Sequence, residues 1–137
     1  MSGEAVGAVP LSVDALRMPA PLTSAFVVPA GARLVVVSGL TAKDGAGRPV
    51  APGDAEAQAD HILGAIDGLL KAAGGSIDDV IKITVFVSDR ADAPAVGRAR
   101  ARWFTKEPFP ASTMVEARLM SDDSLVEFEA LAALPDR

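Results

Sequence analysis

Hydrophobic positions recur along this chain with two periodicities: every second residue, as in a strand, and every three to four residues, as in a helix. Two short β-branched runs, Ser24–Pro29 and Arg33–Ser38, are separated by Pro-Ala-Gly-Ala, and this arrangement predicts a hairpin. A long helix follows, with Asp54 as its expected N-cap and Gly74-Gly75 as its stop. Its expected apolar face consists of Ala55, Ala59, Ile62, Ile66, Leu69 and Ala73, and its polar face of Glu56, Asp60, Asp67 and Lys71.

The second half of the chain continues the succession of strands and helices. Val80–Val87 (VIKITVFV) is the clearest strand pattern in the sequence. A second helix is expected from about Ala93 to Thr105, and two strands follow at Ser112–Arg118 and Leu125–Leu131. The resulting order, β-β-α-β-α-β-β, predicts an α/β (α+β) domain of two layers, with both helices on one face of a sheet.

The strands of this predicted sheet are apolar on both faces. In the last strand Val126, Phe128 and Ala130 suit the core beneath the helices. Glu127 and Glu129 alternate with them and share the opposite face with leucines. Because two helices on one side leave the other side open, the pattern predicts a protein partner there. Self-association is the simplest form of that partnership.

Composition and charge narrow the classes of protein that fit. With 137 residues, 50% of them hydrophobic, the chain is expected to form one domain over 1–137, in which 1–22 is a loosely ordered arm. No apolar run approaches a membrane span, and the N-terminus lacks the apolar region of a secretory signal, so we expect a cytoplasmic protein without membrane contact. One histidine and no cysteine exclude the usual zinc clusters, and a net charge of −5 argues against a nucleic-acid partner.

Two groups of charged residues are candidates for chemistry. Glu127 and Glu129 lie beside leucines at the expected seam between copies, where a partly desolvated carboxylate could act as an acid, a base or a holder of water. The structural alternative is that both carboxylates pair with arginine or lysine. Four arginines cluster around the expected second helix, namely Arg90, Arg98, Arg100 and Arg102. Arg98 and Arg102 are one turn apart, and the cluster fits either an RNA- or anion-binding patch or a solvated helix face.

Five stretches occur in a distinctive order: VVVSGLT, the helix that Gln58 opens, LLKAAGGSIDDVIKITVFVSD, FPASTMVEA and VEFEALAAL. They span about Ser24 to Ala133 and resemble the reactive-intermediate deaminase family (RidA, formerly YjgF-like). The resemblance implies a chorismate-mutase-like fold in a homotrimer, with the sheets forming an inner barrel and three clefts between subunits. Active members hydrolyse enamines or imines such as 2-aminoacrylate to the keto acid and ammonia, with no metal or organic cofactor.

The resemblance also implies roles for individual positions. The family glutamate that orients the attacking water falls on Glu127, and the small residues beneath the ligand fall on Ser38 and Gly39. The family arginine that grips the substrate carboxylate falls on Ser112. The backbone donor that assists this arginine, two residues further on, falls on Met114.

Other positions depart from the family pattern or only approximate it. Phe26 is the aromatic residue nearest to the family tyrosine, and Thr113 supplies a second hydroxyl beside Ser112. The family signature Asp-Phe-x-x-Val-Asn has Ala93 in place of its phenylalanine and Gly97 in place of its asparagine. Because a serine hydroxyl cannot replace a bidentate arginine–carboxylate pair, the sequence predicts a roomier, less cationic cleft. Such a cleft suits a larger ligand, or one without an α-carboxylate.

Three functions are compatible with this sequence. The first is an enzyme of a specialised pathway, in which Glu127 positions water or moves a proton on an enamine, imine or enol-like intermediate and Ser112 and Thr113 contact the small-molecule substrate. The second is a non-catalytic trimer that binds or senses a ligand. The third, an endoribonuclease, rests only on the arginines of the second helix.

Overall fold

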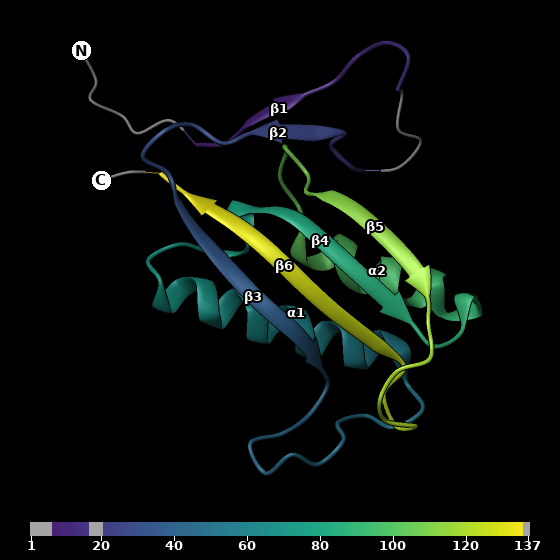
Figure 1. The fold of residues 1–137 in the computed structure, drawn as a ribbon. Helices are drawn as coiled ribbons and strands as arrows, with labels where there is room; N and C mark the ends of the chain where they lie inside the picture. Colours follow the sequence, from purple (N-terminus) through teal and green to yellow (C-terminus); the bar gives the residue numbers. More distant parts are fainter. Residues whose placement is uncertain (1–6, 17–20, 136–137) are drawn as a thin grey trace.

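The fold has two layers, a four-stranded sheet and two helices that pack on one of its faces (Figure 1). The computed structural model describes residues 7–16 and 21–135. Its strands are β1 (Val9–Leu11), β2 (Ala25–Val27), β3 (Arg33–Thr41), β4 (Val80–Val87), β5 (Ala111–Glu116) and β6 (Val126–Leu134). Its helices are α1 (Ala55–Ala72) and α2 (Ala93–Trp103). The predicted two-layer domain is therefore confirmed.

The strand order in the main sheet is β3-β6-β4-β5. The last strand of the chain, β6, lies between β3 and β4 and is antiparallel to both. β5 is parallel to β4, and α2 forms the crossover between them, as a parallel pair requires. The start of β6, which carries the glutamates, therefore lies at the centre of the sheet rather than at an edge.

The predicted hairpin between the first two β-branched runs is wrong. β3 pairs with β6 along a long ladder, from Arg33 opposite Leu134 to Thr41 opposite Glu127. β2 has only three residues, so it could offer β3 far fewer backbone hydrogen bonds than β6 does. It pairs instead with β1 in a second, two-stranded sheet at one end of the main sheet (Figure 1). Part of the segment expected to be a loosely ordered arm is thus a paired strand.

Helix α1 begins as predicted, but two of its side chains are not where the pattern placed them. Asp54 caps the helix, since its carboxylate accepts a hydrogen bond of 3.0 Å from the backbone N–H of Ala57. Leu69, expected on the buried face, is 50% exposed, because Leu70 takes the inward position in the last turns. Asp67, expected on the polar face, is buried, because its carboxylate accepts a hydrogen bond from the backbone N–H of Ile77.

The core lies between the helices and the sheet and is built almost entirely from aliphatic side chains. The predicted inward residues of the last strand, Val126, Phe128 and Ala130, are all buried. Leu34 and Val36 point to the opposite face and are 56% and 76% exposed. The open sheet face is therefore apolar, as the sequence pattern indicated. None of the described helices is long and apolar enough to cross a membrane.

Candidate active site

Glu127 lies on the open face of the sheet, directly over the backbone of Gly39. It stands opposite Thr41 on one neighbouring strand and opposite Phe86 on the other. The pairing of β3 with β6 shifts between Val37 and Leu40, so the strand is irregular where Gly39 lies. A Cβ built on Gly39 would lie 2.5 Å from Oε2 of Glu127, which is closer than real Cβ atoms approach other atoms. Any side chain at this position would therefore displace the Glu127 carboxylate from where it lies.

Neither carboxylate of the last strand forms an ion pair within the described part of the chain. Glu127 is half-buried, whereas Glu129, which stands opposite Thr84, is exposed. The structural alternative, pairing of both glutamates with arginine or lysine, is thus not seen among these residues. Of the two, Glu127 is the more shielded carboxylate and has no internal partner to neutralise it.

The residues predicted on β5 divide between the two faces of the sheet. Thr113 stands opposite Thr84 on the open face, and its Oγ1 accepts a hydrogen bond of 2.8 Å from Nζ of Lys82. Ser112 stands opposite the buried Ile83, and Met114 packs against the core on that same side. One copy of the chain therefore does not bring Ser112 or Met114 to the surface that carries Glu127.

The remaining predicted site residues are likewise separated within one copy. Ser38 precedes Gly39 in the irregular part of β3 and is exposed. Phe26 lies opposite Pro10 in the small β1–β2 sheet, at the other end of the molecule from the start of β6 (Figure 1). One copy thus places Ser38 and Gly39 with Glu127 but holds Phe26 apart, so the contact of Phe26 with a ligand stays a prediction.

Gln58 is a residue whose importance our sequence reasoning missed. Its side chain is 1% exposed and bridges the start of α1 to the loop before β6. Nε2 donates to the carbonyl oxygens of Ala51 and Asp123, at 3.3 and 2.9 Å, and Oε1 accepts from the N–H of Leu125 at 2.9 Å. Because Leu125 is two residues before Glu127, this amide fixes the entry into the strand that carries the carboxylate. A polar residue among the apolar positions of a helix is the signal that could have revealed it.

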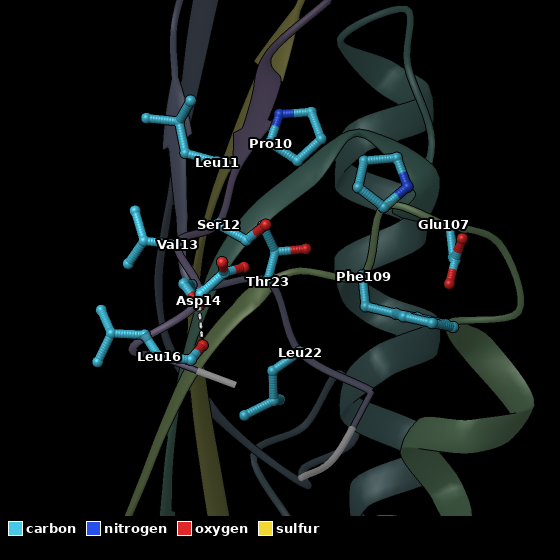
Figure 2. A pocket seen from close by; sticks show the side chains of 12 residues that line it. Pro10, Leu11, Ser12, Val13, Asp14, Leu16, Leu22, Thr23, Glu107 and Phe109 are labelled. Atoms are coloured by element: carbon cyan, nitrogen blue, oxygen red, sulfur yellow. Dashed lines mark hydrogen bonds between the residues drawn. The ribbon is translucent and has the colours of Figure 1, made fainter. Parts of the chain in front are cut away.

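A hollow of about 750 Å³ lies elsewhere, between the β1–β2 sheet and the loop before β5. Figure 2 shows its lining, in which the carboxylates of Asp14 and Glu107 lie among prolines, leucines and Phe109. None of the predicted site residues lines it.

Two of the arginines behind the RNA-binding alternative, Arg98 and Arg102, are engaged in ion pairs. Nε of Arg98 lies 2.6 Å from one carboxylate oxygen of Glu56, and Nη1 of Arg102 lies 2.9 Å from the other. Hydrogen bonds from Arg98 and then Arg102 hold the pKa of Glu56 below its ordinary value. Because Glu56 and the nearby Asp60 balance these charges, the patch offers little positive potential to a phosphate backbone. Among the described residues, no group of three or more histidine or acidic side chains could hold a metal ion.

Comparison with known proteins identifies the family to which this fold and site belong. Residues 17–134 match the family described as Endoribonuclease L-PSP. The 3-aminoacrylate deaminase RutC of Acinetobacter baylyi is 36% identical over 114 residues, which cover 83% of this chain and 90% of that protein. The RutC family protein UK114 of Drosophila melanogaster is 36% identical over 121 residues, which cover 88% of this chain and 85% of that protein.

A solved structure supports the same assignment at the level of the fold. The Rid family protein YyfB of Yersinia pestis superposes with a TM-score of 0.79 at 23% identity, covering 94% of this chain and all of that one. At this level of identity the superposition concerns the fold alone, which is the chorismate-mutase-like fold expected from the motifs. The family match and the two relatives of 36% identity show family membership as well as fold. This chain belongs to the Endoribonuclease L-PSP family, which is the RidA/YjgF family that its motifs resemble.

Proposed function

We propose that this protein hydrolyses a small, reactive enamine or imine and releases ammonia, with Glu127 as the catalytic carboxylate. The observation that carries the proposal is the half-buried, unpaired carboxylate of Glu127 over Gly39 on the open sheet face. A relative of 36% identity is named as a deaminase of 3-aminoacrylate, which is an enamine, and this supports the same reaction class here.

The proposed role of Glu127 is that of a general base and acid in the hydrolysis. Protonation of the enamine at carbon by a proton from solvent gives the iminium ion, and water then adds to the iminium carbon while Glu127 accepts one proton of that water. The resulting carbinolamine takes this proton back on nitrogen, its C–N bond breaks as the hydroxyl oxygen forms the carbonyl, and the hydroxyl proton returns to solvent. The products are a carbonyl compound and ammonia, and Glu127 returns to its starting state. A positioned general base of this kind contributes on the order of 10²- to 10⁴-fold to a rate.

We propose further that the working site is a cleft between subunits of a homotrimer. The exposed apolar residues on the open face, among them Leu34 and Val36, support an assembly in which this face is covered. Assembly would also allow Phe26 of one copy to approach the open face of another, which it does not do within one chain. The protein would act in the cytoplasm, without a metal or organic cofactor.

The substrate we propose lacks the α-carboxylate that relatives with an arginine at the position of Ser112 could grip. Ser112 offers only a hydroxyl, and Thr113, which faces the open side, is already hydrogen-bonded to Lys82. Gly39 and Ser38, next to Glu127, offer no positive charge to a carboxylate. An uncharged imine, or a larger one, fits these groups better than 2-aminoacrylate does.

The proposal is tested by ammonia release from a freshly generated imine in the presence of Glu127→Gln. We expect turnover to fall by about 100-fold or more, because the amide cannot accept the proton of water, while the mass of the assembly stays unchanged. Glu129→Gln is the matched control, since Glu129 is on the same strand face, and it should retain turnover within about twofold. Unchanged turnover in Glu127→Gln would contradict the proposal.

One observation favours a second candidate, a ligand-binding trimer without catalysis. Ser112 and Met114 point toward the helix layer rather than toward Glu127, so one copy lacks part of the predicted constellation. This candidate predicts thermal stabilisation by an imine analogue in wild type and in Glu127→Gln alike, with no turnover by either. Turnover by wild type eliminates it.

A further inference from the structure

A small hollow lies on the helix side of the molecule. It has a volume of about 220 Å³ and lies between the C-terminal half of α2 and the segment that enters β5. Its walls are mostly apolar and include Leu22, Phe104, Phe109 and Pro110. Arg100 is the one charged residue in its lining.

Arg100 differs from its neighbours on α2, because its side chain has no anionic partner in the described part of the chain. Arg98 and Arg102 point to the α1 side and share the carboxylate of Glu56. Within the described ranges, 7–16 and 21–135, the guanidinium of Arg100 has no ion pair and no hydrogen bond. Burial lowers the pKa of Arg100, but an arginine stays charged at neutral pH. A partly desolvated cation without a counter-charge is unfavourable, so an anion at this position would stabilise the site.

The shape of the hollow limits what that anion can be. Gly97 lies on the wall one turn before Arg100, and a Cβ built on it would meet nothing within 4 Å. The free space is smaller than the roughly 300–1,000 Å³ typical of sites for drug-sized ligands. Phe104 and Phe109 offer apolar surface, while the planar fork of a guanidinium matches a carboxylate. Charge and lining together therefore suit a compact carboxylate with an apolar body.

We propose that this hollow binds a small monocarboxylate with an aromatic or branched aliphatic body, held by Arg100. The site is on the helix layer, whereas Glu127 is on the open face of the sheet, so the proposal does not depend on the reaction assigned to Glu127. The carboxylate of the ligand would pair with Arg100, and its apolar body would pack on the apolar lining of the hollow.

Benzoate and its uncharged analogue benzamide are the probes for a titration of the full-length protein by calorimetry. We expect saturable binding of benzoate. Benzamide should bind at least about tenfold more weakly, because only benzoate can form an ion pair with the guanidinium. Arg100→Met keeps the length of the side chain but removes its charge, and it should weaken benzoate binding by about tenfold or more. Arg98→Met is the matched control, because Arg98 is on the same helix and pairs with Glu56, and it should leave benzoate binding unchanged.

Gly97→Leu provides a second test that keeps Arg100 intact. Its side chain would enter the hollow and should abolish benzoate binding, and replacing a helical glycine by leucine does not weaken the helix. Equal binding of benzoate and benzamide, or full benzoate affinity in either Arg100→Met or Gly97→Leu, would overturn the proposal. The absence of saturable benzoate binding by wild type at millimolar concentration would overturn it as well.

Discussion

At the scale of single residues, the contact between Gly39 and Glu127 is the one most sensitive to change. We predict that Gly39→Ala lowers kcat by on the order of 100-fold, because the new methyl group displaces a catalytic carboxylate by about 1 Å. The clash is with the end of a flexible side chain, so the melting temperature should change little. Steady-state kinetics and thermal unfolding measure the two effects separately.

Gly45→Ala serves as the control for this substitution. Gly45 lies in a surface turn where an added Cβ meets nothing within 4 Å, so both kcat and the melting temperature should stay close to wild type. If Gly39→Ala also retained full activity, the position of the Glu127 carboxylate would not matter to the reaction.

The face of the sheet on which a candidate site residue lies could be predicted from the sequence only where strand alternation and a motif agreed. Glu127 met both conditions, and its shielded position on the open face is as expected. Ser112 matched a motif position alone, and its pairing with Ile83 turns it toward the helices. Gln58 was part of a motif, but its bridging role depends on Asp123 and Leu125, which are more than 60 positions away. No local pattern specifies such a contact.

At the scale of elements, Asp67 links α1 to the turn before β4. Burial raises the pKa of its carboxyl, but hydrogen bonds from Lys71 and the N–H of Ile77 outweigh burial and lower the pKa below 3.8. A folded-state pKa below the unfolded value stabilises the fold above about pH 4, and this stabilisation is lost as the pH falls through the folded pKa. We predict that Asp67→Asn costs about 1 kcal/mol at pH 7, and that the difference from wild type shrinks below pH 4.

Chemical denaturation between pH 2 and pH 7 tests this prediction. Asp78→Asn is the control, since Asp78 is more exposed and lies 3.5 Å from an exposed lysine, Lys106, so its loss should have little effect. A difference between Asp67→Asn and wild type that stayed constant over the whole range would show that the charge of Asp67 does not contribute.

The positions of the helices and strands could be predicted from the sequence better than the pairing of the strands. The apolar spacing of α1, its cap at Asp54 and the strand β4 all follow from short-range patterns, and each is confirmed. The pairing of β3 with β6 could not be read in this way, because the two strands are about 90 positions apart and a hairpin with β2 satisfies the same local signals. β3 pairs with β6 rather than with β2 because the β3–β6 ladder is longer. The length of that ladder cannot be read from the residues around β3 alone.

At the scale of the whole molecule, the open sheet face accounts for the proposed trimer. We predict that Val36→Glu, which places a charge on this face in the middle of the edge strand β3, changes the mass in solution from that of three chains to that of one. Light scattering after size-exclusion chromatography gives the mass directly. Helical content should persist, because Val36 is 76% exposed in a single copy.

Leu69→Glu is the control on the opposite side of the molecule. Leu69 is an exposed apolar residue as well, at 50%, but it belongs to α1 rather than to the sheet face, so the trimer should survive. Disruption of the assembly by Leu69→Glu, or its persistence in Val36→Glu, would place the interface elsewhere. The sequence predicted that this face needs a partner, but which residues meet across it depends on the geometry of assembly.

The central claim is that this family member is an imine hydrolase adapted to a substrate without a carboxylate. Its most direct measurement is the initial rate of ammonia release by wild type from the uncharged imine of acetone and from freshly generated 2-aminoacrylate, each compared with buffer alone. We expect acceleration of the hydrolysis of the uncharged imine and a smaller kcat/KM for 2-aminoacrylate. Rates equal to those in buffer for both compounds, or a clear preference for 2-aminoacrylate, would contradict it.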